Sequence, residues 1–204
     1  MKIKVIMSDK AMTRATMDDR ERMLKAALSS DAEVSVDCIK LGPDELDCNT
    51  DESFASAEMV KESIPAAKEG YDAIVIYCFS DVGIDAIREN VRIPVIGPGE
   101  VSLAAAHMLC NRITVLTSGS INIPRTYRRL MRNGMARDKM VSVRALDIPI
   151  GEVRVNPEAT KNYLRAVCKK AVEEDHADGI ILGCLSMAGY GEELEKELPI
   201  KIID

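Results

Sequence analysis

Two cysteines, one in each half of this 204-residue chain, lie where chemistry is expected. Cys78 ends the apolar run of DAIVIYCFSD (residues 72–81), and Cys184 ends that of DGIILGCLSM (residues 178–187). Continuous Ile/Val runs bounded by turn signals are typical of strands buried on both faces. In open α/β sheets the ligand binds outside the carboxyl ends of such strands. Because neither motif contains a histidine, one thiolate could accept a proton and the other thiol could donate one.

The residue types around these cysteines are suited to holding oxygen atoms of a small molecule. Backbone amides and hydroxyls in the strand-to-helix turns could bind carboxylate or imide oxygens and stabilise an enolate formed on deprotonation. Ordinary capping of the following helices is the alternative role for the same groups. The candidate binding residues are Ser8, Phe79, Ser80, Asp81, Thr117, Ser118, Gly119 and Leu185.

The residues after Cys78 also predict its reactivity. Ser80 or Asp81 is expected to cap a helix that begins near residue 81. Backbone N–H groups at a helix start favour an anion and lower the pKa of a nearby thiol. A buried structural cysteine is the alternative, since cysteine is among the most buried residue types. The matching motif at Cys184 favours the functional interpretation of both.

The composition excludes several classes of protein. Hydrophobic residues make up 47% and charged residues 29% of the chain, as in globular proteins, and the net charge is −6. This acidic balance argues against nucleic acid as a partner, and the basic run at residues 125–132 is interpreted as an exposed helix face. No 18-residue apolar segment occurs, and MKIKVIMSDK at the N-terminus is a strand pattern rather than a signal peptide. We therefore expect a cytoplasmic protein with no membrane partner.

The six cysteines show no CxxC pair, and neither Cys78 nor Cys184 has a histidine nearby in the sequence. This pattern indicates buried or reactive thiols rather than a zinc site or a disulfide framework. His107 and His176 lie outside the two motifs and are expected to be structural or surface residues. We therefore expect no metal and no cofactor.

The apolar patterns that position the cysteines predict alternating strands and helices. In the first half we expect strands at 2–7, 33–39, 73–78 and 93–96, and helices at 17–28, 52–68 and 81–89. In the second half we expect strands at 112–117, 140–146, 179–183 and 200–203. Helices there are expected from the GPGE turn to 109, at 124–132, at 157–176 and up to 197.

The two halves repeat one another. KIKVIMSDK at 2–10 matches RITVLTSGS at 112–120, and the two cysteine motifs are 106 residues apart. The predicted order of elements in each half is βαβαβαβ. Right-handed crossovers between the strands then give a four-stranded parallel sheet flanked by helices. We expect two pseudo-symmetric α/β domains, residues 1–98 and 99–204, with the active site in the cleft between them. Gly97 and Gly99 are interpreted as the hinge.

These motifs resemble the aspartate/glutamate/hydantoin racemase superfamily, most closely its hydantoin and allantoin racemase branch. The resemblance lies in DAIVIYCFSDVGIDAIRE (72–89), IPVIGPGEVSLAAAHML (93–109), ITVLTS (113–118) and DGIILGCLSMAG (178–189). Two features depart from the family. Its Asn-Pro-Asn-type loop after the first strand is Ser8-Asp9-Lys10 here, and the chain stops at Asp204, where relatives commonly continue into one more helix.

The resemblance and the paired cysteines together imply a cofactor-independent racemase with a two-base mechanism. Cys78 and Cys184 would exchange the roles of base and acid on opposite faces of a carbon acid such as a 5-substituted hydantoin. An amino-acid racemase or an enolate-forming decarboxylase or isomerase is the alternative within enzymes. A non-catalytic small-acid binding protein is the alternative outside them. The expected partners are a small-molecule substrate and further copies of the chain in a homo-oligomer.

Overall fold

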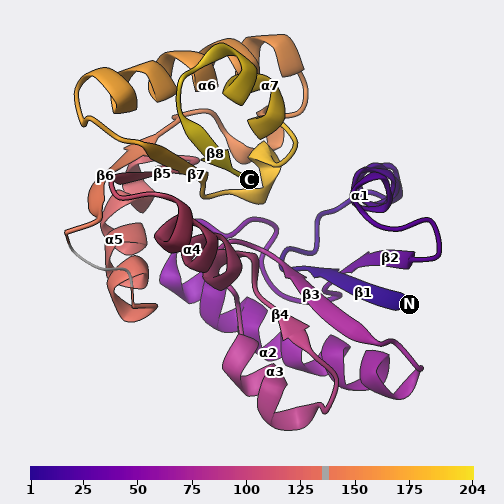
Figure 1. The fold of residues 1–204 in the computed structure, drawn as a ribbon. Helices are drawn as coiled ribbons and strands as arrows, with labels where there is room; N and C mark the ends of the chain where they lie inside the picture. Colours follow the sequence, from indigo (N-terminus) through magenta and orange to yellow (C-terminus); the bar gives the residue numbers. More distant parts are fainter. Residues whose placement is uncertain (135–137) are drawn as a thin grey trace. The chain divides into compact units, whose positions relative to one another are not determined.

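The computed structural model describes residues 1–134 and 138–204, which form two compact units. The first unit is Met1–Pro98 and the second is Gly99–Asp204. Each contains one four-stranded parallel sheet with helices on both faces (Figure 1). The strand orders are β2-β1-β3-β4 and β6-β5-β7-β8, so the two sheets have the same topology.

The first unit alternates strands and helices along the chain. Its strands are β1 (Lys2–Met7), β2 (Glu33–Cys38), β3 (Ala73–Tyr77) and β4 (Val95–Ile96). Its helices are α1 (Arg14–Ala27), α2 (Asn49–Lys68) and α3 (Ile84–Asn90).

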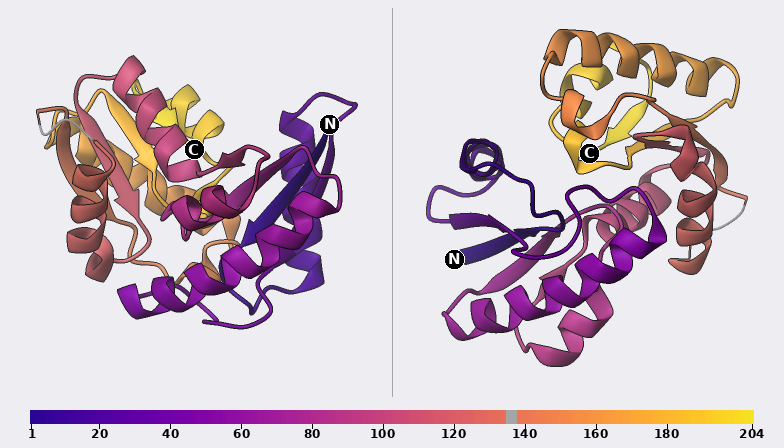
Figure 2. Two further views of the ribbon diagram at one scale, coloured as in Figure 1. Left: turned by 90° about the horizontal axis from the view of Figure 1, so that it is seen from below. Right: turned by 180° about the vertical axis from the view of Figure 1, so that it is seen from behind.

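The core of the first unit lies between its sheet and α2. Ile6, Ile74 and Ile76 of the sheet are fully or almost fully buried and pack in one cluster with Met59 of α2. Helix α1 lies on the opposite face, as two views of the ribbon show (Figures 1 and 2). These opposite placements follow from the strand period, because successive side chains point to opposite faces of a sheet.

The second unit repeats this plan with additional short helical turns. Its strands are β5 (Ile113–Thr117), β6 (Met140–Ala145), β7 (Gly179–Leu182) and β8 (Lys201–Ile203). Its α-helices are α4 (Pro98–Leu109, beginning one residue before the unit), α5 (Ile123–Arg132), α6 (Pro157–Glu173) and α7 (Gly191–Glu197). Three 3₁₀ turns are η1 (Ser120–Asn122), η2 (Ile150–Glu152) and η3 (Leu185–Met187).

Close packing in the second unit explains the glycine that begins β7. Leu164 and Cys168 of α6 are fully buried in a cluster with Ile180 of β7. A Cβ on Gly179 would lie 2.3 Å from the sulfur of Cys110, closer than van der Waals contact permits. The position therefore requires glycine for space rather than for backbone conformation.

The predicted fold class is confirmed, since both halves form four-stranded parallel sheets flanked by helices. Several helix boundaries differ from the prediction by about three residues, and two of the differences, at the starts of α1 and α3, have a visible cause. Helix α1 begins at Arg14 rather than residue 17 because Thr13 caps it, its hydroxyl accepting the N–H of Thr16. Helix α3 begins at Ile84 rather than residue 81, and its cap is Gly83.

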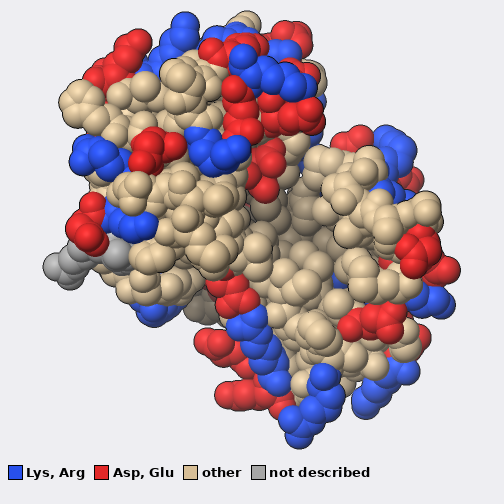
Figure 3. Space-filling view, viewed as in Figure 1, with Lys and Arg blue, Asp and Glu red and all other residues tan. Residues whose placement is uncertain are grey.

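Acidic and basic side chains are intermingled on the face of the molecule that Figure 3 shows. This distribution agrees with the small net charge of −6. Within the described ranges 1–134 and 138–204, no helix is long and apolar enough to span a bilayer.

Candidate active site

Cys78 directly follows β3 and begins a tight turn. The N–H of Asp81 donates to the carbonyl oxygen of Cys78 at 3.0 Å. The side chain is partly buried and packs against the core cluster of the first unit. The sulfur is thus fixed at the carboxyl end of a central strand, as predicted.

The expected helix start beside Cys78 is wrong. Helix α3 begins six residues after the cysteine and has seven residues, so neither Ser80 nor Asp81 caps it. The reason is Gly83, which has a φ of 74° and lies close to α2: a Cβ there would come within 3.1 Å of the carbonyl oxygen of Ser56. The chain therefore passes α2 in an extended turn before a helix can begin.

Ser8 directly follows β1, the strand that pairs with β3 in the same sheet. Met7 pairs with Tyr77 in the parallel ladder, so Ser8 and Cys78 are the next positions along the two neighbouring strands. Ser8 is buried although it is polar. The structure therefore places Ser8 on the same sheet edge as Cys78.

The three residues after Cys78 have structural contacts of their own. Phe79 is buried, which leaves its backbone rather than its ring to face a ligand. The hydroxyl of Ser80 donates to Glu52 Oε1 at 2.7 Å and joins the turn to the start of α2. Asp81 is buried with a φ of 50°, and a Cβ on Gly97 would lie 2.6 Å from its carboxyl group. Their roles in binding stay predictions.

Cys184 begins the equivalent turn in the second unit. The N–H of Met187 donates to the carbonyl oxygen of Cys184 at 2.9 Å, and the intervening residues, beginning with Leu185, form η3. The sulfur lies 3.1 Å from the hydroxyl oxygen of Ser186, within hydrogen-bond distance. The side chain is partly buried against the core cluster of this unit. The two cysteines thus occupy the same position in the topology of their sheets, and each begins a turn closed by the N–H of the third following residue.

Polar residues also lie at the end of β5, the strand that pairs with β7. Thr117 and Ser118 are buried, and their carbonyl oxygens accept the N–H groups of Leu146 and Asp147. Ser118 Oγ accepts a weak hydrogen bond from the side-chain amide of Asn122. Gly119 precedes η1, and its carbonyl oxygen accepts the Asn122 N–H at 3.0 Å.

Ser118 corresponds to Ser8 by register. Leu116 pairs with Leu182, so Ser118 lies two positions beyond the last pair, as Cys184 does on the neighbouring strand. Each cysteine therefore has a buried serine at the end of the adjacent central strand.

Two residues near Cys184 were not identified from the sequence. Ser186 contacts the cysteine sulfur, and a hydroxyl two residues after a candidate cysteine was the signal that could have found it. Arg154 donates to the carbonyl oxygens of Ser186 and Ala188, and its guanidinium lies over the ring of Tyr190. Arg154 therefore holds the loop that carries Cys184, a role with no local sequence signal.

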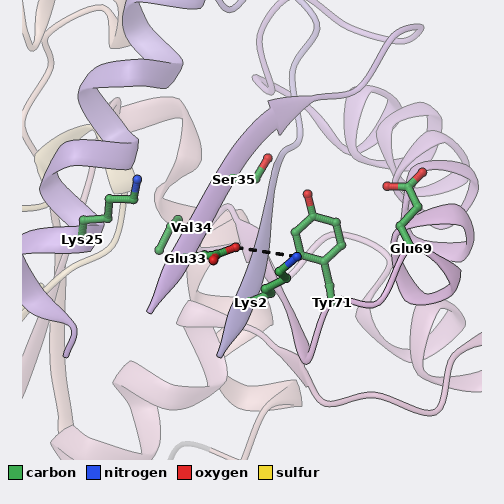
Figure 4. Close-up of a pocket in the computed structure, with 7 residues that line it drawn as sticks. All are labelled: Lys2, Lys25, Glu33, Val34, Ser35, Glu69 and Tyr71. Carbon is green, nitrogen blue, oxygen red and sulfur yellow. Dashed lines mark ion pairs between the residues drawn. The ribbon is translucent and has the colours of Figure 1, made fainter. Parts of the chain in front are cut away.

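A hollow of about 430 Å³ lies at the other end of the first sheet (Figure 4). Lys2 and Glu33, which form an ion pair of 3.7 Å across it, are the first residues of β1 and β2. Tyr71 and Glu69 precede β3. The hollow is therefore at the amino ends of the strands and is separate from the candidate site.

Burial shifts the pKa of two groups close to the sheet ends. The pKa of Asp9, which follows Ser8, is raised to about 6 by burial and, to a smaller extent, by the charge of Glu45. The pKa of the Cys38 thiol is raised by burial and then by the charge of Asp9. The loop after β1 therefore holds a carboxyl group that titrates nearer neutrality than an exposed aspartate.

Comparison with known proteins defines the class to which this fold and these turns belong. The family model for Asp/Glu/hydantoin racemases matches residues 9–204. A hydantoin racemase of Pseudomonas sp. (strain NS671) is 35% identical over 208 residues, covering 100% of this chain and 81% of the relative. A hydantoin racemase of Paenarthrobacter aurescens is 32% identical over 167 residues, covering 80% of this chain and 69% of the relative.

Solved structures agree with the sequence comparison. The allantoin racemase from Klebsiella pneumoniae superposes with a TM-score of 0.90 at 26% identity, covering 100% of this chain and 82% of that one. The protein is thus a racemase, an enzyme of the isomerase class. The chain belongs to the Asp/Glu/hydantoin racemase family.

Proposed function

We propose that this racemase inverts the ring carbon of a 5-substituted hydantoin or a related cyclic ureide. We further propose that Cys78 and Cys184 serve as its two acid–base groups. The observation that carries the proposal is the equivalence of the two cysteines. Each ends a central strand of the same sheet topology, each begins a turn closed by a hydrogen bond from the third following residue, and each adjoins a buried serine.

In the proposed reaction one cysteine acts as thiolate and removes the proton from the ring carbon. The electron pair of the broken C–H bond moves into the adjacent carbonyl group and gives an enolate. The other cysteine, as thiol, then donates its proton to the opposite face of the carbon. The product is the other enantiomer, and the two cysteines have exchanged protonation states, so the reverse reaction uses the same groups in exchanged roles.

This mechanism requires the two units to present their cysteines to opposite faces of one carbon. Each sulfur must approach that carbon to within about 3–3.5 Å, which corresponds to roughly 7–10 Å between the sulfurs with room for the substrate. Active-site closure of this kind also excludes water, which strengthens the hydrogen bonds that hold the enolate oxygen. The amides and hydroxyls at Ser8, Ser80, Thr117 and Ser118 are the proposed donors.

Hydantoins are favoured as substrates by the named relatives and by the acidity of the carbon. The two hydantoin racemases named above are 35% and 32% identical to this chain. A ring carbon between a carbonyl group and a nitrogen loses its proton more easily than the α-carbon of an amino-acid carboxylate. Each pKa unit of additional acidity lowers the cost of the carbanion by about 1.4 kcal/mol.

Polarimetry on single enantiomers tests the proposal. The panel contains 5-methylhydantoin, 5-benzylhydantoin, allantoin, aspartate and glutamate, with solvent deuterium exchange followed in parallel by NMR. We expect loss of optical rotation with a hydantoin, with one solvent deuteron incorporated for each inversion. Racemisation of aspartate or glutamate alone would assign the chain to amino-acid chemistry, and exchange with none of the five would reject the proposal.

A further inference from the structure

Arg20 is buried in the middle of α1 although it carries a full positive charge. Its side chain is 6% exposed, and its Nε and Nη1 atoms have no hydrogen-bond partner among residues 1–134 and 138–204. The carboxylate of Asp19 lies 3.6 Å from Nη1, close enough for an ion pair but too far for a hydrogen bond. Buried charges in folded proteins are normally paired and hydrogen-bonded, because an unfilled charged donor is costly to bury. The unfilled donors of Arg20 therefore call for an explanation.

The position of Arg20 brings these donors to the edge of the sheet that carries Cys78. Its guanidinium lies over the ring of Tyr77, 6.0 Å from the centroid. Tyr77 is the last residue of β3 and directly precedes Cys78. Helix side chains lean toward the helix N-terminus, and α1 begins at this edge, where Arg14 reaches the carbonyl oxygen of Val36 in β2. The charge is thus directed toward the carboxyl ends of the strands.

A second polar group at this edge is also incompletely satisfied. Asp9 Oδ1, in the loop after β1, is buried without a hydrogen-bond partner. Asp9 and Arg20 have opposite charges, yet in the part of the chain that the structure describes they do not pair with each other. Among the described residues, the edge of the first unit therefore has both a cationic donor and a carboxyl oxygen without a hydrogen-bond partner.

We propose that Arg20 determines specificity by binding a carboxylate group on the substituent of the substrate. The guanidinium is planar and always charged, and carboxylate is the partner that both fills its donors and neutralises it. A neutral carbonyl oxygen would fill one donor and leave the buried charge uncompensated. This inference rests on the proposed function, because it places the reacting carbon beside Cys78. It adds that the preferred substrate is an anionic hydantoin such as hydantoin-5-acetate.

The ratio of kcat/KM for hydantoin-5-acetate to kcat/KM for 5-methylhydantoin measures this preference. We compare the wild type with Arg20→Met, Arg20→Lys and Arg22→Met. Arg22 is the matched control, because it is on the same helix and pairs with the same Asp19 but is 73% exposed. The ratio is expected to fall about 10- to 100-fold in Arg20→Met, to fall less in Arg20→Lys, and to stay constant in Arg22→Met. An unchanged ratio in Arg20→Met overturns the proposal.

Thermal unfolding separates binding from a structural role. Methionine fills a volume similar to the arginine stem and removes an uncompensated buried charge, so Arg20→Met should unfold at the same temperature as the wild type or higher. A structural arginine would give the opposite result. A lower unfolding temperature together with equal losses on both substrates would therefore reject the proposed role.

Calorimetric titration with hydantoin-5-acetate keeps this test independent of the proposed reaction. Binding that is lost in Arg20→Met and kept in Arg22→Met supports the role of Arg20, even if the wild type racemises neither hydantoin and the proposed function fails. Binding of equal strength in both variants rejects the role of Arg20. In that case racemisation of 5-methylhydantoin would leave the proposed function standing.

Discussion

The two units share one topology but differ in the side chains that lie around the carboxyl ends of their central strands. In the second unit, Ser186 contacts the sulfur of Cys184, and Arg154 donates to the carbonyl oxygens of Ser186 and Ala188. The first unit has the same strand order, but at its edge Asp9 and Arg20 have buried polar atoms without a partner.

This difference in side chains predicts that the two units contribute differently to the proposed site. The second unit holds its cysteine in a loop that is already braced by side chains. The first unit keeps donors and acceptors available at its edge, and buried polar groups of this kind are most favourable when a ligand completes them. Under the proposed function, both units contribute a cysteine and oxygen-binding groups, and we expect the first unit also to select the substituent of the substrate.

Replacing each cysteine in turn is the most severe test of the shared chemistry. A serine hydroxyl is too weak an acid to form the alkoxide, so in both Cys78→Ser and Cys184→Ser racemisation should fall at least about 1,000-fold in both directions. Each variant keeps the other of these two cysteines. In deuterium oxide each variant should therefore still exchange the proton of one substrate enantiomer without inverting it, and the two variants should exchange opposite enantiomers. Cys48→Ser, at an exposed position, is the control. Near-normal racemisation by either variant would rule out a two-base mechanism.

Alkylation rates test whether the two cysteines are the reactive thiols of their units. Cys168 is fully buried, and burial raises the pKa of its thiol to about 12. At pH 8 its thiolate fraction is only about 1 in 10,000, so iodoacetamide should modify Cys78 and Cys184 at least about 100-fold faster. Peptide mass spectrometry after limited treatment gives the rates. Modification of Cys168 or the exposed Cys48 ahead of both Cys78 and Cys184 would contradict the proposed assignment.

Two partly buried carboxylates should give stability changes of opposite sign in the two units. Burial raises the pKa of Asp9 to about 6, so the folded first unit binds a proton more tightly than the unfolded chain, and stability falls as pH rises from about 4 to 6. The hydrogen bond from Arg144 lowers the pKa of Asp175, so that contribution is present above the unfolded pKa and is lost as pH falls below it.

Substitution by asparagine measures both contributions. At pH 8, Asp9→Asn should stabilise the fold by about 1–3 kcal/mol, and this gain should disappear near pH 4. Asp175→Asn should instead destabilise the fold at pH 8, with a smaller loss in acid. Thermal or urea unfolding at the two pH values gives the comparison, and changes of the same sign at pH 8 would contradict the opposite environments of the two carboxylates.

Removing the contact between Ser186 and Cys184 should change the activity least among the substitutions considered. In the Cys78→Ser background only Cys184 can exchange a proton, so Ser186→Ala measures the hydroxyl directly. Loss of one hydrogen bond should lower deuterium exchange about 3- to 10-fold. Arg154→Met should act in the same direction, because it releases the loop that holds Ser186. If Ser186→Ala exchanges as fast as its parent, the hydroxyl does not support the thiolate.

The sequence predicted the strands and the cysteine turns because these depend on local patterns. Apolar runs ending at residues 77 and 182 define the central strands, and the repeat places them equivalently in two sheets. The start of α3 could not be predicted in this way. It depends on the contact between Gly83 and Ser56 of α2, which lies far from Gly83 in the sequence.

Arg20 shows a second limit of sequence patterns. Met17, Met23 and Leu24 are apolar residues of α1, and they are only partly buried. The buried residue of the helix is Arg20, in the charged run DDRER. Periodicity ranks positions by hydrophobicity, so it cannot identify a charge that tertiary packing places over Tyr77. Such a residue is recognised only when its hydrogen bonds are examined in three dimensions.

The continuity of each sheet has a consequence for biosynthesis. All four strands of the first sheet come from residues 2–96, and those of the second come from residues 113–203, so no strand is exchanged between the units. Domains of this kind fold as units while the ribosome is still translating. The first sheet can be completed before the second has been synthesised. A nascent chain stalled after the first unit has left the exit tunnel should therefore already resist proteolysis over that unit.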